Sequence, residues 1–172
     1  MVFKTISCCA DPMLNGHYYS YVSNTTKFWG AIEQASTLSY QGLPGHVATL
    51  GSFTEFNFLL DLYGGNAWLG QTDESSEGTF RYVTGPENGL AALYLPWDSR
   101  QPDNCCGGEH FLHITGSQRV NDISDVSLPY YVEYDCPQLT TLGAYGCTRT
   151  CVCVCLSVCL SVCLSVCLCM CL

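Results

Sequence analysis

Apolar and polar residues alternate near the start of the chain in a pattern that predicts a strand followed by a helix. Residues 18–22 read Tyr-Tyr-Ser-Tyr-Val and favour an extended strand. Residues 27–38 then carry apolar side chains at helical spacing, and Thr26 is placed to cap this helix. The apolar face of the predicted helix consists of Phe28, Ile32 and Ala35.

A second helix is predicted to begin at Ser52. Ser52 and Glu55 form a capping-box pattern, in which each side chain bonds to a backbone N–H at the start of the helix. The helix would end at Gly64-Gly65. Its inward-facing side chains would be Phe56, Leu59 and Leu60.

Short apolar segments later in the chain predict strands on either side of a long loop. Residues 67–70 are typical of a buried strand, and residues 80–83, 111–114 and 130–134 also favour strands. Residues 84–108 are rich in Gly, Pro, Asn and Asp and show little periodicity. Long irregular loops in compact domains are usually functional or disordered. The order of helices and strands is that of an α+β fold.

The two ends of the chain differ in composition from its centre. Residues 12–136 are expected to form one domain, followed by a linker at 137–150. Residues 1–11 have too short an apolar run for a signal peptide, so a truncated N-terminus is one interpretation of this segment. Residues 151–172 repeat Cys-Leu-Ser-Val and hold eight of the 14 cysteines. This tail is either translated simple-sequence DNA or a membrane anchor, since an uncharged run of this length can span a bilayer.

The charge of the chain limits the classes of partner that it is expected to bind. It has only six Lys and Arg among 172 residues and a formal net charge of −9, so no nucleic acid or anionic membrane is expected as a partner. Five acidic residues lie between Asp98 and Asp125, with Gln101, Asn104 and Asn121 among them. Such oxygen donors are the ligands that Ca²⁺ takes in proteins. Composition alone leaves open that this stretch is simply solvated.

The spacing of these residues resembles the sugar-binding calcium site of the C-type lectin family. The triplet Gln101-Pro102-Asp103 is followed by Glu109 and by the pair Asn121-Asp122, at the family's spacing. Other family motifs lie in order, and the resemblance covers roughly residues 15–135. These motifs are Val47-Ala48-Thr49-Leu50, Ala67-Trp68-Leu69-Gly70, Asp73, Glu77-Gly78, Tyr82-Val83-Thr84-Gly85 and Pro96-Trp97.

This resemblance implies a C-type lectin-like fold, with two helices, small antiparallel sheets and a long irregular loop carrying the calcium site. It implies a cis peptide before Pro102, which turns the neighbouring side-chain oxygens toward one ion. Two sugar hydroxyls would complete the coordination, and the amide-first order of the triplet favours galactose-type over mannose-type hydroxyl pairs. The implied calcium ligands are Gln101, Asp103, Glu109, Asn121 and Asp122. The implied sugar contacts are Gln101, Asp103, Glu109 and Asn121.

Some positions depart from the family pattern. Val120 replaces the Trp that usually precedes the Asn-Asp pair, and Cys105 stands where galactose-type sites often carry an aromatic residue. The expected galactose preference is weaker for that reason. Both core disulfides of the family are missing, and the carboxylate of Asp125 has no evident role at its position. The four cysteine positions are held by Ala35, Phe111, Asp125 and Val132.

The resemblance also implies an auxiliary calcium site, in which His110 would be a poor ligand for Ca²⁺. His110 and His113 form an H-x-x-H pattern, but on a strand the two side chains would face opposite ways. We therefore interpret both as satisfied structural histidines and not as zinc ligands. The implied auxiliary ligands are Asp73, Glu77 and Asn104, with Glu109 shared between the two sites.

Calcium-dependent carbohydrate binding is the leading functional hypothesis. Its partners would be glycans or glycoproteins, and a shallow site of this kind gives weak binding that multivalency in an oligomer would strengthen. No catalytic arrangement is identifiable, so an enzyme is not expected. Extracellular calcium suits such a site, so secretion or surface display is expected, with membrane attachment only if the tail is an anchor. The alternative is a lectin-like interaction module that binds a protein or another surface without sugar.

Overall fold

The fold is described from a computed structural model, which describes residues 13–14, 16–135, 152–153 and 169–170. The chain divides into two units, Asp11–Pro137 and a second unit formed by Met1–Ala10 with Gln138–Leu172. In the second unit β10 (Val152–Cys153) pairs antiparallel with β11 (Cys169–Met170). No helix among the described residues is long and apolar enough to cross a membrane. Segment 1–11, the linker at 137–150 and most of the tail lie outside the described residues.

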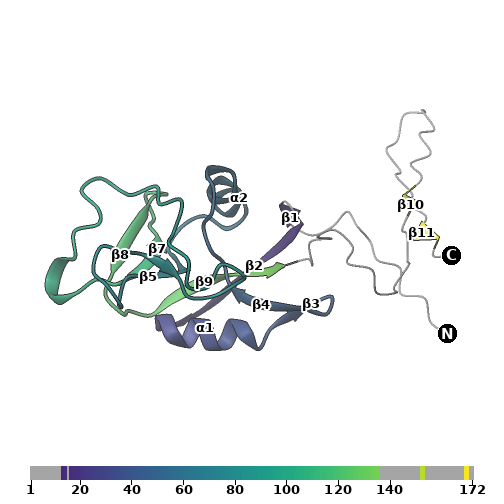
Figure 1. The fold of residues 1–172 in the computed structure, drawn as a ribbon, viewed down its shortest axis with the longest axis horizontal. Helices are drawn as coiled ribbons and strands as arrows, with labels where there is room; N and C mark the ends of the chain where they lie inside the picture. Colours follow the sequence, from purple (N-terminus) through teal and green to yellow (C-terminus); the bar gives the residue numbers. More distant parts are fainter. Residues whose placement is uncertain (1–12, 15, 136–151, 154–168, 171–172) are drawn as a thin grey trace. The chain divides into compact units, whose positions relative to one another are not determined.

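Nine of the described strands form one mixed sheet in the first unit (Figure 1). The order along it is β1-β2-β9-β5-β7-β8, while β4 pairs with β9, β3 with β4, and β6 with β5. Only β5 and β9 run parallel. The small antiparallel sheets expected from the sequence are joined into one, because β9 pairs with β2, β4 and β5. The strands are β1 Met13–Leu14, β2 His17–Thr26, β3 Ser39–Tyr40, β4 Leu43–Val47, β5 Ala67–Thr72, β6 Arg81–Tyr82, β7 Phe111–Ile114, β8 Val120–Ile123 and β9 Leu128–Asp135.

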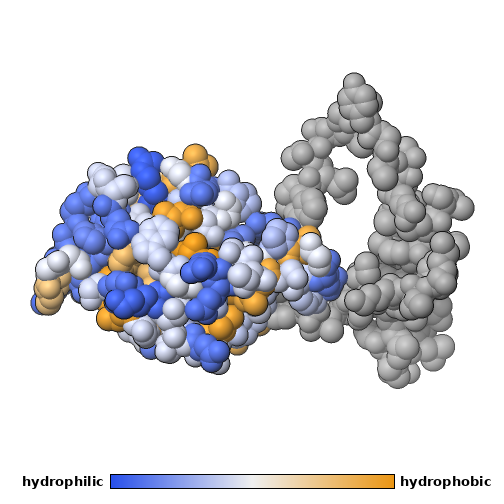
Figure 2. Space-filling model, turned by 90° about the horizontal axis from the view of Figure 1, so that it is seen from below, coloured by the Kyte–Doolittle hydropathy of each residue, from blue (hydrophilic) through white to orange (hydrophobic). Residues whose placement is uncertain are grey.

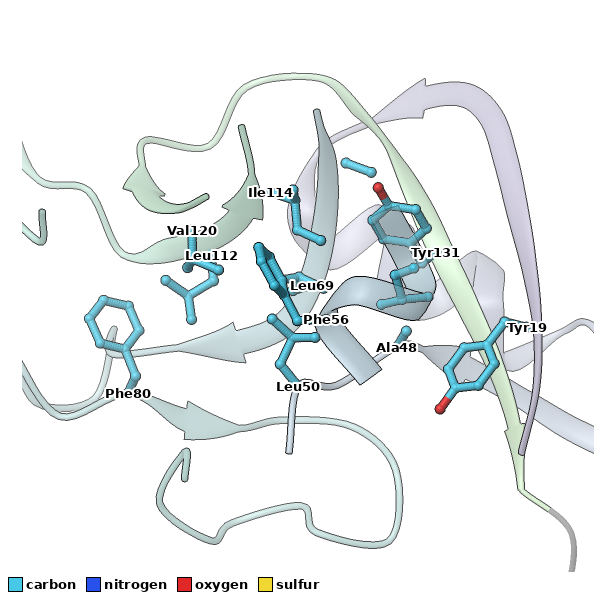
Figure 3. Close-up of a cluster of buried hydrophobic side chains, with 12 residues drawn as sticks. Tyr19, Ala48, Leu50, Phe56, Leu69, Phe80, Leu112, Ile114, Val120 and Tyr131 are labelled. Carbon is cyan, nitrogen blue, oxygen red and sulfur yellow. The ribbon is translucent and has the colours of Figure 1, made fainter. Parts of the chain in front are cut away.

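Two helices, α1 (Phe28–Ser36) and α2 (Phe53–Tyr63), lie on opposite sides of the central strands (Figure 1). Side chains of β5 alternate between the two sides, as expected for a strand. Leu69 joins the cluster that packs under α2, and Trp68 joins the cluster around α1. Figure 3 shows the α2 cluster, in which Phe56 and Leu69 meet and Phe80 lies at one end. The strand order and both helices confirm the predicted α+β fold.

The second helix begins as predicted from its capping box. Glu55 N–H donates to Ser52 Oγ at 3.2 Å. The Glu55 carboxylate accepts from Gly51 N–H at 2.7 Å, one residue earlier than the usual capping box. The helix ends at Gly64, whose φ of 74° favours glycine. Phe56 and Leu59 are buried as predicted, while Leu60 is partly buried.

The first helix begins differently from the prediction. Thr26 belongs to β2, and the N-cap residue Lys27 makes no side-chain capping bond. Instead, Phe28 N–H donates to Asp125 Oδ1 at 2.9 Å, from a residue 97 positions later in the chain. A carboxylate at this end also favours the positive end of the helix dipole. The role that the sequence did not reveal for Asp125 is therefore to cap α1.

The positions of the two missing disulfides form other contacts. The Phe111 ring packs on Phe28 with their centroids 4.5 Å apart, and Asp125 caps the same residue. Ala35 and Val132 are fully buried in one apolar cluster. Aromatic packing, a helix cap and apolar burial thus stand where the family has covalent bridges.

The outer surface is mixed in character. Figure 2 shows hydrophilic residues spread over one face of the first unit, with small hydrophobic areas among them. Exposed apolar side chains include Phe53 at the start of α2 and Leu90 and Leu93 in the long loop. Scattered exposed apolar residues of this kind are normal in soluble domains.

Candidate functional site

The long loop is attached to β8 immediately before the Gln101-Pro102-Asp103 triplet. Asp98 N–H donates to the Val120 carbonyl at 2.8 Å, and Val120 N–H donates to the Pro96 carbonyl at 3.0 Å. Val120 is fully buried, and the Trp97 ring packs edge-on against Phe80 with their centroids 5.2 Å apart. Apolar support under the site therefore comes from Trp97 and Phe80, although Val120 replaces the expected Trp.

The triplet itself has the backbone geometry that the resemblance implies. The Gln101–Pro102 peptide is cis. Arg100, Asn104 and Cys106 adopt left-handed φ angles of 72°, 44° and 60°. Such conformations are uncommon for residues other than glycine and cluster at functional sites.

Asp122 on β8 holds the triplet loop in place. Its side chain is fully buried, and its two carboxylate oxygens accept from the N–H groups of Asp103, at 3.4 Å, and Asn104, at 3.0 Å. The loop is tied to itself as well. Glu109 N–H donates to Asn104 Oδ1 at 2.9 Å, and Cys105 N–H donates to Glu109 Oε2 at 3.1 Å. Residues 103–109 are therefore ordered by the same side chains that carry the oxygen donors.

Three carboxylates converge at this point. Asp103, Glu109 and Asp122 each offer an oxygen, and the three oxygens lie within 4.8 Å of one another. Partial burial, together with the neighbouring charges of Asp122 and Asp103, raises the pKa of Glu109. Among the described residues no Lys or Arg forms an ion pair with these carboxylates. A divalent cation is the group that would relieve this repulsion.

The two amide residues of the predicted site, Asn121 and Gln101, differ in their hydrogen bonding. Asn121 Oδ1 is buried and has no hydrogen-bond partner, while its amide nitrogen lies 3.4 Å from His113 Nε2. An unpartnered buried carbonyl oxygen is unfavourable unless a ligand satisfies it. Gln101 Oε1 accepts from Asp103 N–H at 3.1 Å, a bond within the triplet itself. The donor set of carboxylate and amide oxygens fits Ca²⁺.

The predicted auxiliary residues divide between two places. Asp73 and Glu77 form a group with His110, whose Nδ1 lies 3.1 Å from Asp73 Oδ1 and 3.5 Å from Glu77 Oε2. Asn104 instead bonds to Glu109 in the main loop. An imidazole therefore lies among the carboxylates at the position of the expected auxiliary calcium site.

The two histidines of the H-x-x-H pattern have separate surroundings, as predicted. His110 contacts Asp73, whereas His113 is buried and lies beside Asn121. The interpretation of His113 as fully satisfied is wrong, because its Nδ1 has no partner. Burial lowers the pKa of His113 to about 4, so the ring is neutral near pH 7.

The exposed end of the loop carries a disulfide between the neighbouring residues Cys105 and Cys106. Both residues are exposed, and Cys105 takes the place of the expected aromatic residue. Another group of potential ligands, His17, Glu133 and Asp135, was not recognised in the sequence. The available signal was the Glu133-x-Asp135 spacing at the end of the predicted strand 130–134, because a strand that continues to Asp135 places both carboxylates on one face.

Comparisons with known proteins agree with the fold of the first unit. No family model matches the sequence. The chain is 33% identical over 131 residues to halomucin from Haloquadratum walsbyi, covering 70% of this chain and 1% of halomucin. It is 36% identical over 91 residues to C-type lectin domain family 4 member F of Mus musculus, covering 52% of this chain and 16% of that protein. The chain thus spans only a small part of these relatives.

Solved structures with the same fold include proteins of different binding properties. C-type lectin CEL-I from Cucumaria echinata matches with a TM-score of 0.63 and 20% identity, over 74% of this chain and 98% of that chain. The trimeric Kupffer cell C-type lectin receptor matches with a TM-score of 0.56 and 27% identity, over 73% and 82% of the two chains. A calcium-independent type II antifreeze protein matches with a TM-score of 0.59 and 14% identity, over 74% and 93%.

Proposed function

The first unit of the chain is a C-type lectin-like domain, and from this premise we propose that it binds carbohydrate through a calcium ion. The proposed ion lies between the triplet loop and β8. Its ligands are the side-chain oxygens of Gln101, Asp103, Glu109, Asn121 and Asp122.

One observation carries the proposal. The oxygens of Asp103, Glu109 and Asp122 converge within 4.8 Å, and the side-chain oxygen of Asn121, the residue before Asp122, is buried without a partner. Ca²⁺ binds about six to eight oxygens at about 2.3–2.6 Å, so these side chains supply most of one coordination shell. Their loop is already tied by hydrogen bonds, and such preorganisation favours binding.

The sugar binds at the coordination positions of the ion that the protein side chains leave free. Two neighbouring hydroxyls replace water on the ion, while each hydroxyl also donates to a carboxylate and accepts from an amide. In this chain the amide of Gln101 comes first and the carboxylate of Asp103 second. We assign a galactose-type preference on this order, weakened because Cys105 supplies no aromatic ring for the apolar face of the sugar.

The direct test is retention on a galactose resin. The full chain is expected to bind in calcium and to be released by EGTA. Asp103→Ala is expected to abolish retention and to weaken calcium binding by at least about 30-fold, equivalent to the ~2 kcal/mol expected for losing a charged partner. Calcium affinity is measured by isothermal titration calorimetry, and circular dichroism checks the fold.

A matched control is available in the same loop. Asp98 is an acidic residue whose carboxylate accepts from Ser99 N–H at 2.7 Å, away from the carboxylate cluster. Asp98→Ala is expected to keep calcium-dependent retention. Retention that EGTA does not change, or calcium binding without retention of any sugar, would overturn the proposed function.

The second candidate is a lectin-like module that binds a non-sugar surface. It is favoured by the exposed Cys105–Cys106 pair in place of an aromatic sugar platform. A type II antifreeze protein has a similar fold, and its name indicates one kind of non-sugar surface for this candidate. Under this alternative the wild type binds no glycan on a mixed-glycan array, with or without calcium.

The proposed role is one of binding and not of catalysis. Glycans or glycoproteins on a surface outside the cell are the proposed partners, where free calcium is high enough to fill such a site. Single sites of this kind bind weakly, so we propose that copies of the chain act together.

A further inference from the structure

A cluster of His and carboxylate side chains lies on the other half of the sheet from the proposed calcium site. His17 Nδ1 is 2.8 Å from Glu133 Oε1 and 2.6 Å from Asp135 Oδ1. The three ligand atoms lie within 4.8 Å of one another. In the sheet order, β9 is separated from β8 by β5 and β7, which places the two clusters roughly 14 Å apart or more. The two clusters are therefore separate.

Strand pairing positions these side chains on a rigid surface. His17 on β2 pairs directly with Asp135 on β9, and Tyr19 pairs with Glu133. Because side chains two residues apart share a face of a strand, Glu133 and Asp135 both project toward His17. Sites built on paired strands hold their geometry better than sites on loops.

Each carboxylate of the cluster is also oriented by an outer partner. Asp135 directs Oδ2 to His46 Nε2 at 2.8 Å, which leaves Oδ1 facing His17. Glu133 Oε2 accepts from Thr49 N–H at 3.2 Å. Outer partners of this kind, which fix the ligand side chains, are typical of metal centres.

A cavity of 170 Å³ opens beside the cluster. Its lining includes His17, Tyr19, Glu55 and Glu133. Tyr19, labelled at one end of the core cluster in Figure 3, donates from its hydroxyl to Glu55 at 2.9 Å and to Glu133 at 3.2 Å. The cavity gives solvent or a small ligand access to the His17 and Glu133 side of the cluster.

We propose that His17 Nδ1, Glu133 Oε1 and Asp135 Oδ1 bind a zinc ion, with a fourth coordination position open to this cavity. Zinc binds His nitrogen and Asp or Glu oxygen, and its four-coordinate centres can take three protein ligands and leave the fourth position open. Zn–ligand distances of about 2.0–2.2 Å in a tetrahedral site place neighbouring ligand atoms about 3.3–3.6 Å apart. The His17 nitrogen therefore needs to move away from each of the two carboxylate oxygens by roughly 0.5–1 Å to admit the ion.

The chemistry of the cluster favours zinc over calcium. Ca²⁺ requires a shell of oxygen ligands, whereas this cluster supplies a nitrogen and has two of its four carboxylate oxygens bonded to Thr49 and His46. The His17 nitrogen lies directly between two carboxylate oxygens, Glu133 Oε1 and Asp135 Oδ1. The position between these side chains thus favours positive charge, which a divalent cation supplies more strongly than a proton.

The test is a zinc titration of the full chain in excess calcium, which keeps the proposed calcium site filled. All free thiols are first alkylated, because thiols bind zinc. Isothermal titration calorimetry is expected to show one bound zinc per chain. His17→Gln is expected to weaken zinc affinity by more than the roughly 10–100-fold that loss of an outer partner causes. His46→Gln is expected to cause a loss within that range.

The matched control is His110→Gln, which removes the imidazole from the similar group with Asp73 and Glu77. This variant is expected to keep full zinc affinity. A wild type that binds no zinc, or a loss caused by His110→Gln and not by His17→Gln, would overturn the proposal.

A second measurement needs no variant. Zinc is expected to shift the ring resonances of His17 in the wild type, measured by NMR on protein labelled with nitrogen-15 histidine. His110 is the internal reference and is expected to keep its resonances. Unchanged His17 resonances after zinc addition would contradict the assignment even if the His17→Gln variant does not fold.

Discussion

Individual side chains in the proposed sugar site have more than one role. Asp122 offers oxygens to the proposed ion and also accepts from two backbone N–H groups of the triplet loop. Glu109 likewise offers oxygens to the proposed ion and also accepts from the Cys105 N–H. A carboxylate oxygen has several lone pairs, so it can accept a hydrogen bond and ligate an ion together. Substituting these residues therefore changes loop order as well as ligand number. Gln101→Glu keeps an oxygen that can accept from Asp103 N–H, so an exchange within the triplet allows a cleaner test of specificity.

Exchanging the amide and the carboxylate of the triplet is expected to reverse sugar preference. In the double variant Gln101→Glu with Asp103→Asn, total charge and ligand number are unchanged, but the donor–acceptor order across the two hydroxyls is inverted. We expect the ratio of mannose to galactose affinity to rise by about 10-fold or more, equivalent to ~1.4 kcal/mol. Competition by the two free sugars measures this ratio, and an unchanged ratio at full calcium affinity would contradict the assigned roles.

The buried neutral ring of His113 is expected to make the fold less stable in acid. Burial lowers its pKa to about 4, whereas the unfolded chain has the ordinary value of about 6.5. Below the unfolded value the unfolded state binds more protons, so stability falls as the pH drops from 6.5 to 4, by about 3 kcal/mol in total. Urea unfolding in EGTA measures this dependence, and His113→Phe is expected to flatten it.

At the level of elements, the start of α1 depends on a side chain from far along the chain. The Asp125 carboxylate accepts from Phe28 N–H, and the Phe111 ring packs on Phe28. Both residues occupy positions where the family has a disulfide. Tertiary contacts therefore fix this helix end, whereas α2 is fixed by its own Ser52 and Glu55.

Removing the distant cap is expected to destabilise the fold without affecting sugar binding. Asp125→Ala should lower the free energy of unfolding by ~1 kcal/mol, the usual effect of losing a helix cap. Asp125→Asn keeps an acceptor oxygen and should retain most of that stability. Thermal unfolding measures both, with Glu33→Ala on the exposed face of α1 as control. Equal stability of Asp125→Ala and wild type would show that the cap contributes nothing.

The contrast between the local cap of α2 and the distant cap of α1 explains what the sequence could predict. The capping box of α2 and the buried strand β5 are local patterns, so both were predicted. The cap of α1 was assigned to Thr26 because the true partner lies 97 residues away. The spacing of the site residues predicted a cluster that includes Asp103, Glu109 and Asp122, but it could not show the contact of His110 with Asp73. Cross-strand groups such as His17 with Asp135 depend on register, which no local pattern reveals.

The whole molecule combines a net charge of −9 with carboxylates that are gathered at specific points. Repulsion within the cluster of Asp103, Glu109 and Asp122 opposes folding when no cation is bound. A ligand that binds only the folded state stabilises it by mass action. The proposed calcium site therefore couples the stability of the first unit to the calcium concentration.

Calcium is expected to raise the unfolding temperature of the wild type. At about 100 times the dissociation constant the stabilisation is ~2.7 kcal/mol, which corresponds to a shift of roughly 5–10 °C for a domain of this size. EGTA should reverse the shift, and Asp103→Ala should show little of it. Differential scanning calorimetry makes the measurement, and an equal shift in the variant would place the bound calcium elsewhere.

Non-covalent contacts stand at the four positions where the family has core cysteines. They also determine how the first unit responds to its redox environment. Within the described residues the only disulfide joins neighbours in the chain, Cys105 and Cys106, and links no two elements of the fold. A domain whose core depends on bridges loosens when a reductant opens them. Here the packing of Phe111 on Phe28, the cap from Asp125 and the burial of Ala35 and Val132 involve no sulfur. The sheet and helices of this unit should thus tolerate reducing conditions, with any effect of a reductant confined to the loop tip beside the proposed sugar site.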